Sequence, residues 1–269
     1  MSSASLYLEF TRMTFLQMLA YRLRYYTGVV TYLVFVAGNT ALYHAMYASL
    51  PAGKTIGGFS LPEILTYVAI SWVGRSLTFN NIDREMAQQV TAGNIGQSLL
   101  KPVDYQLMSY FSAIGEMGFR LLLFTVPISL VIFPLFRVGG PASAAAAGWA
   151  FVSFLLGFFV NTGVNFVVGT FALHLKSIWG VIRAKSIVME LLTGTMVPFS
   201  FFPATFRKIA EALPFQAIGY VPVTIWLGKR DGHDIVSSLI LQAMWAVVLF
   251  AVGTLLWRIG VKRTTIQGG

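Results

Sequence analysis

Residues 235–257 read IVSSLILQAMWAVVLFAVGTLLW, a run of 23 positions without a charged side chain. About 20 apolar residues are enough for a helix to cross the roughly 30 Å hydrocarbon core of a bilayer. Three basic residues, Arg258, Lys262 and Arg263, follow the run closely. The stretch therefore predicts a transmembrane helix whose C-terminal end is anchored at one membrane surface.

The whole chain has the composition of a membrane protein. Of its 269 residues, 56% are hydrophobic and 11% are charged, whereas soluble domains carry about 25% charged residues. The formal net charge is +9, but the basic residues stand in short groups between apolar runs. We interpret this charge as a topology signal and expect no nucleic-acid partner.

Six stretches are long and apolar enough to qualify as membrane spans, with at most a few interior charges. The fifth is the shortest and contains Glu190, Pro198 and Pro203. We predict an all-α integral membrane protein with six transmembrane helices in one domain over residues 1–269. The predicted spans are residues 25–50, 62–82, 105–136, 143–173, 186–203 and 235–257.

Two segments outside these spans are also predicted to meet the membrane. Residues 4–24 carry leucine and aromatic side chains on one broad helical face, which predicts an interfacial helix; a continuation of the first span remains open. Residues 204–230 hold Pro214, Pro222 and an uncharged run from Ala212 to Gly228, which pairs with the earlier apolar stretch from Ile187 to Phe202. They predict either a re-entrant external hairpin or an ordinary external loop with one amphipathic helix.

The distribution of basic residues predicts that both termini face the cytoplasm, since cytoplasmic loops are enriched in Lys and Arg. With this orientation the inner side holds Arg12, Arg22, Arg24, Arg84, Lys101, Lys176, Arg183, Lys185, Arg258, Lys262 and Arg263. The outer side holds Lys54, Arg137, Arg207, Lys208, Lys229 and Arg230.

Four charged residues fall inside or beside predicted spans: Arg75, Glu116, Arg120 and Glu190. Charge in hydrocarbon is costly and usually faces a bundle interior or a wet cavity, so we assign these side chains to a translocation path or to the bundle interior. Glu116 and Arg120 are four residues apart and can pair on one helix face. Arg75 could meet Glu116 or Glu190 across helices.

The fourth span carries a stripe of small and amide residues, Gly157, Asn161, Asn165 and Gly169, at a spacing of four. Small residues let helices approach closely, and amides hydrogen-bond across the contact. The stripe indicates a helix-packing seam more than a substrate track.

The chain shows no pattern typical of an enzyme. The tripeptide Gly53-Lys54-Thr55 resembles the end of a phosphate-binding loop, but Ala48 stands where its first glycine is required. No residue cluster resembles a hydrolase signature, and the three histidines lie on separate segments. We expect no catalytic residue, no metal site and no cofactor in this chain.

Residues 83–102, DREMAQQVTAGNIGQSLLKP, are polar but hold apolar positions that a solvated loop does not need. The pattern predicts a short helix stopped at Gly93-Asn94 and a second piece ending at Leu100 before Pro102. Ile95, Leu99 and Leu100 indicate a docking surface.

Taken together, the interfacial helix, six spans, amphipathic cytoplasmic segment and proline-broken hairpin resemble the permease subunit of a type-two ATP-binding-cassette exporter. The string from Gly93-Asn94-Ile95 to Leu99-Leu100-Lys101-Pro102-Val103 is similar to the Gly-x-Ile…Leu-Leu-Arg-Pro-Val pattern of a bacterial branch that contains viologen and multidrug exporters. Lys101 stands where that pattern has arginine.

The resemblance implies a multi-pass protein of the bacterial cytoplasmic membrane that pairs with a second permease, identical or related. Two separate ATPase subunits would bind ATP and Mg, and an amphipathic or hydrophobic substrate, such as a drug, lipid or glycan-like molecule, would pass between the permeases. The implied ATPase-coupling residues are Asp83, Arg84, Glu85, Gly93, Asn94, Ile95, Gln97, Leu100 and Lys101. The implied external gate consists of Phe199, Phe201, Phe202 and Phe215.

Two other functions share the same hydropathy. An ATP-independent secondary transporter or channel would be supported by inverted repeats, and residues 25–137 and 143–258 show no convincing similarity. A membrane scaffold that only recruits a partner protein is the other alternative to the exporter. The cytoplasmic segment distinguishes the exporter from both.

Overall fold

The computed structural model describes residues 3–21, 23–51, 53–175 and 177–263. Helices dominate these residues and no β-strand occurs among them, which confirms the all-α fold class. The α-helices are α1 (Ser3–Ala20), α2 (Leu23–Ala48), α3 (Leu61–Thr78), α4 (Ile82–Thr91), α5 (Ile95–Leu99), α6 (Tyr105–Arg120), α7 (Val126–Leu135), α8 (Ala144–Thr170), α9 (Trp179–Leu192), α10 (Ala204–Ala212), α11 (Tyr220–Trp226) and α12 (Gly232–Arg263). Short turns of other helix types are η1 (Leu121–Thr125), η2 (Phe171–Leu173), η3 (Phe199–Phe201) and η4 (Pro214–Ala217).

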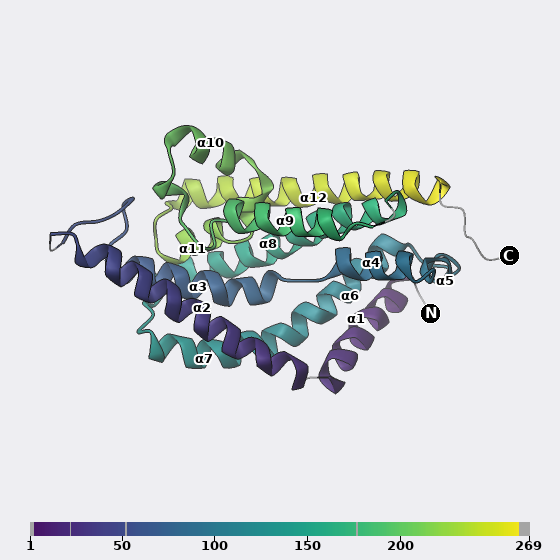
Figure 1. Ribbon diagram of the computed structural model, residues 1–269, viewed down its shortest axis with the longest axis horizontal. Coiled ribbons are helices and arrows are strands. Elements are labelled where there is room, and N and C mark those ends of the chain that lie inside the picture. Colours follow the sequence, from purple (N-terminus) through teal and green to yellow (C-terminus); the bar gives the residue numbers. More distant parts are fainter. Residues whose placement is uncertain (1–2, 22, 52, 176, 264–269) are drawn as a thin grey trace.

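The helices form an elongated bundle with two distinct ends (Figure 1). One end carries α4, α5, the start of α1 and the end of α12, and the other carries the loop after α2 together with α10 and α11. Helices α8, α9 and α12 occupy one half of the bundle, and α2, α3 and α7 occupy the other. Both ends of the described chain therefore lie on the same side as α4 and α5.

Four helical stretches are long and apolar enough to cross a membrane. They are Gly28–Ala48, Tyr105–Leu135, Ala144–Leu173 and Gly232–Lys262, and they coincide with the first, third, fourth and sixth predicted spans. The second and fifth predicted spans correspond to α3 and α9, which have 18 and 14 residues and carry charged side chains. A multi-pass membrane protein is supported by these helices, and the count of six spans stays a prediction.

The fifth span needs a correction of its bounds, because residues 186–203 do not form one helix. Helix α9 begins at Trp179 and ends at Leu192. Gly194 then adopts a φ of +70°, a left-handed conformation that stops the helix. The chain continues through the short turn η3 before α10 begins.

Helix α3 lies at the centre of the bundle and is enclosed by protein along most of its length. It begins with a capping box in which the Glu63 carboxylate accepts a hydrogen bond from the backbone N–H of Ser60. Ile64, Tyr67 and Val68 are fully buried against neighbouring helices. A helix enclosed in this way does not need an uncharged surface, so α3 can carry Arg75 near its end.

The N-terminal helix α1 is a separate element that packs along α6. Its hydroxyl at Thr11 donates a hydrogen bond to the carbonyl of Phe111 at 2.8 Å, and Tyr7 stacks on Phe111. Helices α1 and α2 run in different directions (Figure 1). The alternative that α1 simply continues the first span is therefore wrong, while its place in a membrane interface stays a prediction.

The segment over residues 204–230 is not a plain loop. It consists of α10, η4 and α11, and every residue from Tyr220 to Ile225 is buried. Helix α11 packs against α8 and α3. This burial against protein fits the re-entrant alternative better than the exposed loop, and re-entry into a membrane stays a prediction.

We predict that Gly115→Ala destabilises the fold by about 1–3 kcal/mol, because a Cβ at Gly115 would lie 2.2 Å from the Thr11 carbonyl oxygen and force α1 away from α6. Thermal unfolding in a mild detergent measures the effect. Gly148→Ala is the matched control: its Cβ would meet nothing within 4 Å, so the exchange should be neutral or stabilising by about 0.5–1 kcal/mol. Equal stability of both variants would contradict close packing of α1 on α6.

Candidate functional site

The segment over residues 83–102 folds as two short helices joined by a tight turn, as its sequence predicts. Helix α4 ends at Thr91, and Gly93 takes a φ of +72° that a residue with a side chain rarely adopts. The N–H of Asn94 donates to the carbonyl of Gln89 at 2.8 Å and closes the turn. Helix α5 follows and ends at Leu99.

The apolar residues of this segment point in two directions. Ile95 is 4% exposed and packs in a core cluster with Met86 and Tyr105. Leu100 is 86% exposed. The expectation that Ile95 forms part of a docking surface is therefore wrong, because its apolar side chain is needed to attach α5 to the bundle. The exposed members of the predicted coupling set are Arg84, Glu85, Gly93, Asn94, Gln97, Leu100 and Lys101.

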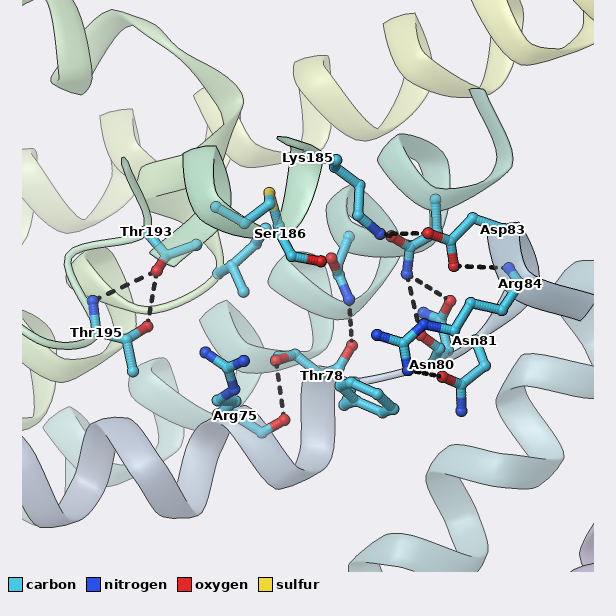
Figure 2. Close-up of a pocket in the computed structure, with 15 residues that line it drawn as sticks. Arg75, Thr78, Asn80, Asn81, Asp83, Arg84, Lys185, Ser186, Thr193 and Thr195 are labelled. Atoms are coloured by element: carbon cyan, nitrogen blue, oxygen red, sulfur yellow. Dashed lines mark hydrogen bonds and ion pairs between the residues drawn. The ribbon is translucent and has the colours of Figure 1, made fainter. Parts of the chain in front are cut away.

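Asp83 also faces inward, at the start of α4. Its carboxylate accepts a hydrogen bond from the Lys185 ammonium group on α9 at 2.6 Å, and Lys185 donates a second to the Asn165 amide oxygen on α8, also at 2.6 Å (Figure 2). The Asp83 side chain is 2% exposed. A direct contact of Asp83 with an ATPase surface, as its place in the predicted coupling set implied, is thus excluded in this conformation.

Amide side chains of α8 extend this network to the junction between α3 and α4. Asn165 donates to the Asn80 side-chain oxygen at 2.8 Å and to its carbonyl at 3.2 Å. Asn161 donates to the carbonyl of Thr78 at 2.8 Å. These carbonyls lie where α3 has ended, and α8 thereby supplies the partners that buried backbone groups require.

The stripe on α8 is a packing seam, as predicted. A Cβ at Gly157 would lie 2.4 Å from the carbonyl oxygen of Ala217, and a Cβ at Gly169 would lie 3.2 Å from the Cα of Asp83. The small residues thus allow close approach of other chain segments, and the asparagines between them bond across the contact.

The charged residues of the predicted path form two separate pairs. Arg120 donates two hydrogen bonds to one oxygen of Glu116, at 2.7 and 2.9 Å, and both side chains are nearly buried. Arg75 lies 3.9 Å from Glu190, and both are substantially exposed. The predicted pair of Glu116 and Arg120 on one helix face is confirmed. Of the two predicted partners of Arg75, Glu190 is its neighbour. A role of these four residues in transport stays a prediction.

Two of the cavities that adjoin the segment over residues 83–102 hold most of its charged residues. A pocket of about 100 Å³ lies between the end of α3, the start of α4, α8 and α9, and Arg75, Arg84 and Lys185 line it (Figure 2). A larger cavity of about 610 Å³ lies between α1, α4 and α6, with Glu85 and Glu116 on its wall.

The large cavity changes the acidity of Glu85. Although its carboxyl group opens onto the cavity, the protein around it removes bulk water, and this desolvation together with the charges of Glu116 and Asp83 raises the pKa of Glu85 to about 7. Lys101 lines the same cavity. The charge of Glu85 therefore changes near neutral pH.

The four phenylalanines of the predicted external gate do not form one group. Phe199 is completely buried and stacks on Tyr220 with ring centroids 4.5 Å apart. Phe201 packs against Phe59, and Phe202 packs against Phe206. Phe215 lies apart from them, in η4. Phe199 belongs to the core, and a gate role stays a prediction for this set.

A family profile described as ABC-2 family transporter protein matches residues 33–268. This chain belongs to the ABC-2 transporter family. Neither curated proteins nor solved structures give a match. The family comprises the membrane component of ATP-binding-cassette transporters, which works with an ATPase subunit, so the chain is a membrane permease of an exporter of this type. Membership of the viologen-exporter branch stays a prediction.

Sequence patterns do not identify the residues that attach the segment over residues 83–102 of this ABC-2 permease to its bundle. Lys185 counted only as a topology charge, and Asn80 carried no signal at all. The asparagine stripe on α8 was the available indication, since intramembrane amides need partners. Among the described residues, no group of three or more His, Asp and Glu side chains could hold a metal ion.

We predict that Lys185→Met destabilises the permease by about 3 kcal/mol or more, because it leaves the Asp83 carboxylate buried without its partner. The double variant with Asp83→Asn should lose less than the sum of the two single losses. Thermal unfolding in detergent measures this cycle. Arg12→Met is the control: it breaks a surface pair with Glu9 and should lower the free energy of unfolding by less than about 1 kcal/mol. If the losses of the two single variants at Asp83 and Lys185 add exactly in the double variant, the buried link is contradicted.

We predict that Glu85→Gln removes part of the pH dependence of stability. Because the pKa of Glu85 is raised to about 7, the folded state holds this proton more tightly than the unfolded state, and stability is lost as pH rises from about 5 to about 7. The variant should thus gain stability over the wild type across this range, as measured by unfolding at each pH. Glu211→Gln, on α10, is the control and should follow the wild type.

Proposed function

We propose that the permease pairs with a second permease, identical or related, and with two ATPase subunits that bind ATP and Mg, and that α4 and α5 form the coupling helix. The single observation that carries this proposal is the buried link from Asp83 through Lys185 and Asn165 to Asn80. A two-helix segment with an exposed outer surface at one end of the bundle is thereby fixed to α8, α9 and the end of α3.

The link would transmit a movement of the ATPase subunits to the helices of the permease. Closure of the ATPase subunits would press on the exposed surface around Leu100 and Gln97, which protrudes from the end of the bundle. Because the start of α4 is tied to α9 by an ion pair and to α8 and the end of α3 by amide hydrogen bonds, α4 cannot shift without these helices following. Packed elements of this kind move as bodies between discrete arrangements.

The substrate path would run between the two permeases along α2, α9 and the end of α3 that carries Arg75. Helix α9 exposes Ile187 and Leu191, which suit contact with lipid, a second permease or an apolar substrate. We assign the protein to the bacterial cytoplasmic membrane with both termini inside, since α4, α5 and the two ends of the described chain share one end of the bundle. An amphipathic or hydrophobic substrate, exported as in multidrug efflux, fits this apolar face.

We predict that Leu100→Glu reduces association with the ATPase at least about tenfold, because it places a charge on the most exposed apolar residue of the coupling segment. Co-purification of the partner ATPase in mild detergent measures this loss, with ATP-dependent transport in vesicles as the second readout. Ile209→Glu is the matched control, since Ile209 is also exposed and lies on α10 at the opposite end.

Two results would contradict the proposal. If no ATPase of the nucleotide-binding-domain type accompanies the wild-type permease in conditions that preserve such complexes, the coupling role fails. Transport that continues without ATP would favour the alternative, a secondary transporter or channel.

A further inference from the structure

The polar pocket between α3, α4, α8 and α9 carries excess positive charge. Arg75, Arg84 and Lys185 line it, and Asp83 is the one acidic residue of its wall. Lys185 is satisfied by Asp83 and Asn165. The two arginines lie on either side of Thr78 in Figure 2 and face the pocket. Arg84 donates one hydrogen bond to the side-chain oxygen of Asn81 at 3.4 Å.

The guanidinium group of Arg75 has few hydrogen-bond partners for an arginine inside the bundle. A guanidinium group has five N–H donors, yet within the described chain it donates no hydrogen bond within 3.5 Å. Its contacts are the ring of Trp72, 5.4 Å from its centre, and the Glu190 carboxylate at 3.9 Å. Since arginines within membrane spans are costly and usually have polar partners, this geometry indicates room for an acceptor that the chain does not supply.

An apolar cavity adjoins the polar pocket on the next face of α9. It measures about 240 Å³, and its wall consists of Ile187, Glu190, Leu191, Met196, Val197 and Phe202. Ser186 and Met189 of α9 line the polar pocket instead. Glu190 lies between these two helical faces and is the neighbour of Arg75, so the two cavities meet at this ion pair.

We infer that the two cavities together bind an amphiphile with an anionic phosphate headgroup. Arg75 and Arg84 would hold the phosphate, and the apolar cavity would hold the beginning of its hydrocarbon chain. The polar pocket, at about 100 Å³, has space for a headgroup and not for a whole lipid. The inference rests on the proposed function for the claim that such a molecule is transported, because α9 and the end of α3 line the proposed path.

Phosphate suits this pocket for two reasons. Guanidinium groups bind phosphate through short, charge-assisted hydrogen bonds that a carboxylate 3.9 Å away does not provide. Hydroxyl groups of Ser186, Thr193 and Thr195 also line the pocket. Ser186 donates to the carbonyl of Ile182, and Thr193 and Thr195 bond to each other, so one hydroxyl proton of this threonine pair is left to donate to a phosphate oxygen. A bound phosphate would displace Glu190 from Arg75, and the Arg75–Glu190 pair would occupy the empty site as a weak substitute.

The test measures binding of dodecyl phosphate to the purified full-length permease in a neutral maltoside detergent, without ATPase and without ATP. Intrinsic tryptophan fluorescence reports binding because Trp72 lies beside Arg75. Dodecyltrimethylammonium has the same chain with the opposite charge, and inorganic phosphate has the headgroup without the chain. We expect dodecyl phosphate to bind at least about tenfold more tightly than either.

Variants with opposite expected effects make the test specific. Arg75→Gln should weaken dodecyl phosphate binding about tenfold or more, since it removes a charge-assisted hydrogen-bond donor. Glu190→Gln should tighten it about threefold, because it removes the competing carboxylate. Arg12→Gln, at an exposed pair on α1, and Glu211→Gln, on α10, make the same charge changes elsewhere and should bind like the wild type.

Each outcome decides the inference. Equal binding of the cationic amphiphile, or equal effects of Arg75→Gln and Arg12→Gln, would overturn it. Binding of inorganic phosphate as tight as that of dodecyl phosphate would assign the site to a free anion and overturn the amphiphile. If Arg75→Gln does not fold, Glu190→Gln decides, because tighter binding supports the site and unchanged or weaker binding refutes it. Failure of ATPase association leaves these binding results unaffected, so the two proposals are tested separately.

Discussion

The buried ion pair between Asp83 and Lys185 is the constraint on which the functional end of this permease depends. A carboxylate that is 2% exposed is tolerated only when a charged partner and further hydrogen bonds satisfy it. That requirement brings α9 to the start of α4, and the second hydrogen bond of Lys185 brings α8 to the same point. The positions of the segment over residues 83–102, the polar pocket and the end of α3 are linked through it.

The backbone groups at the end of α3 also receive their hydrogen bonds from side chains of another helix. Helix α3 ends at Thr78 while still inside the bundle, and its free carbonyl groups need donors. From α8, Asn161 donates to the carbonyl of Thr78, and Asn165 donates to the carbonyl of Asn80 just beyond the end of α3. The same seam is tight enough that Gly157 and Gly169 contact neighbouring backbone, so α8 serves both as a packing surface and as the source of polar partners.

Sequence patterns located most of the elements because hydrophobic length and breaker residues are local properties. The run over residues 235–257 predicts α12, Gly93-Asn94 predicts the end of α4, and the i, i+4 spacing of Glu116 and Arg120 predicts their pair. The predicted fifth span begins after Lys185, whereas α9 begins at Trp179 and includes Arg183 and Lys185, because charged residues bound an apolar run without ending the helix. Ile95 was misread as a docking residue because an amphipathic pattern does not show which face is covered.

The sequence by itself determined a helical membrane protein with a two-piece polar segment, since apolar length, charge spacing and glycine conformation act within a few residues. Only the tertiary structure decided that Asp83 turns inward to Lys185, 102 residues away in sequence, and that Arg75 opens onto a pocket. Such partnerships depend on which helices lie side by side. No periodicity within one helix contains that information.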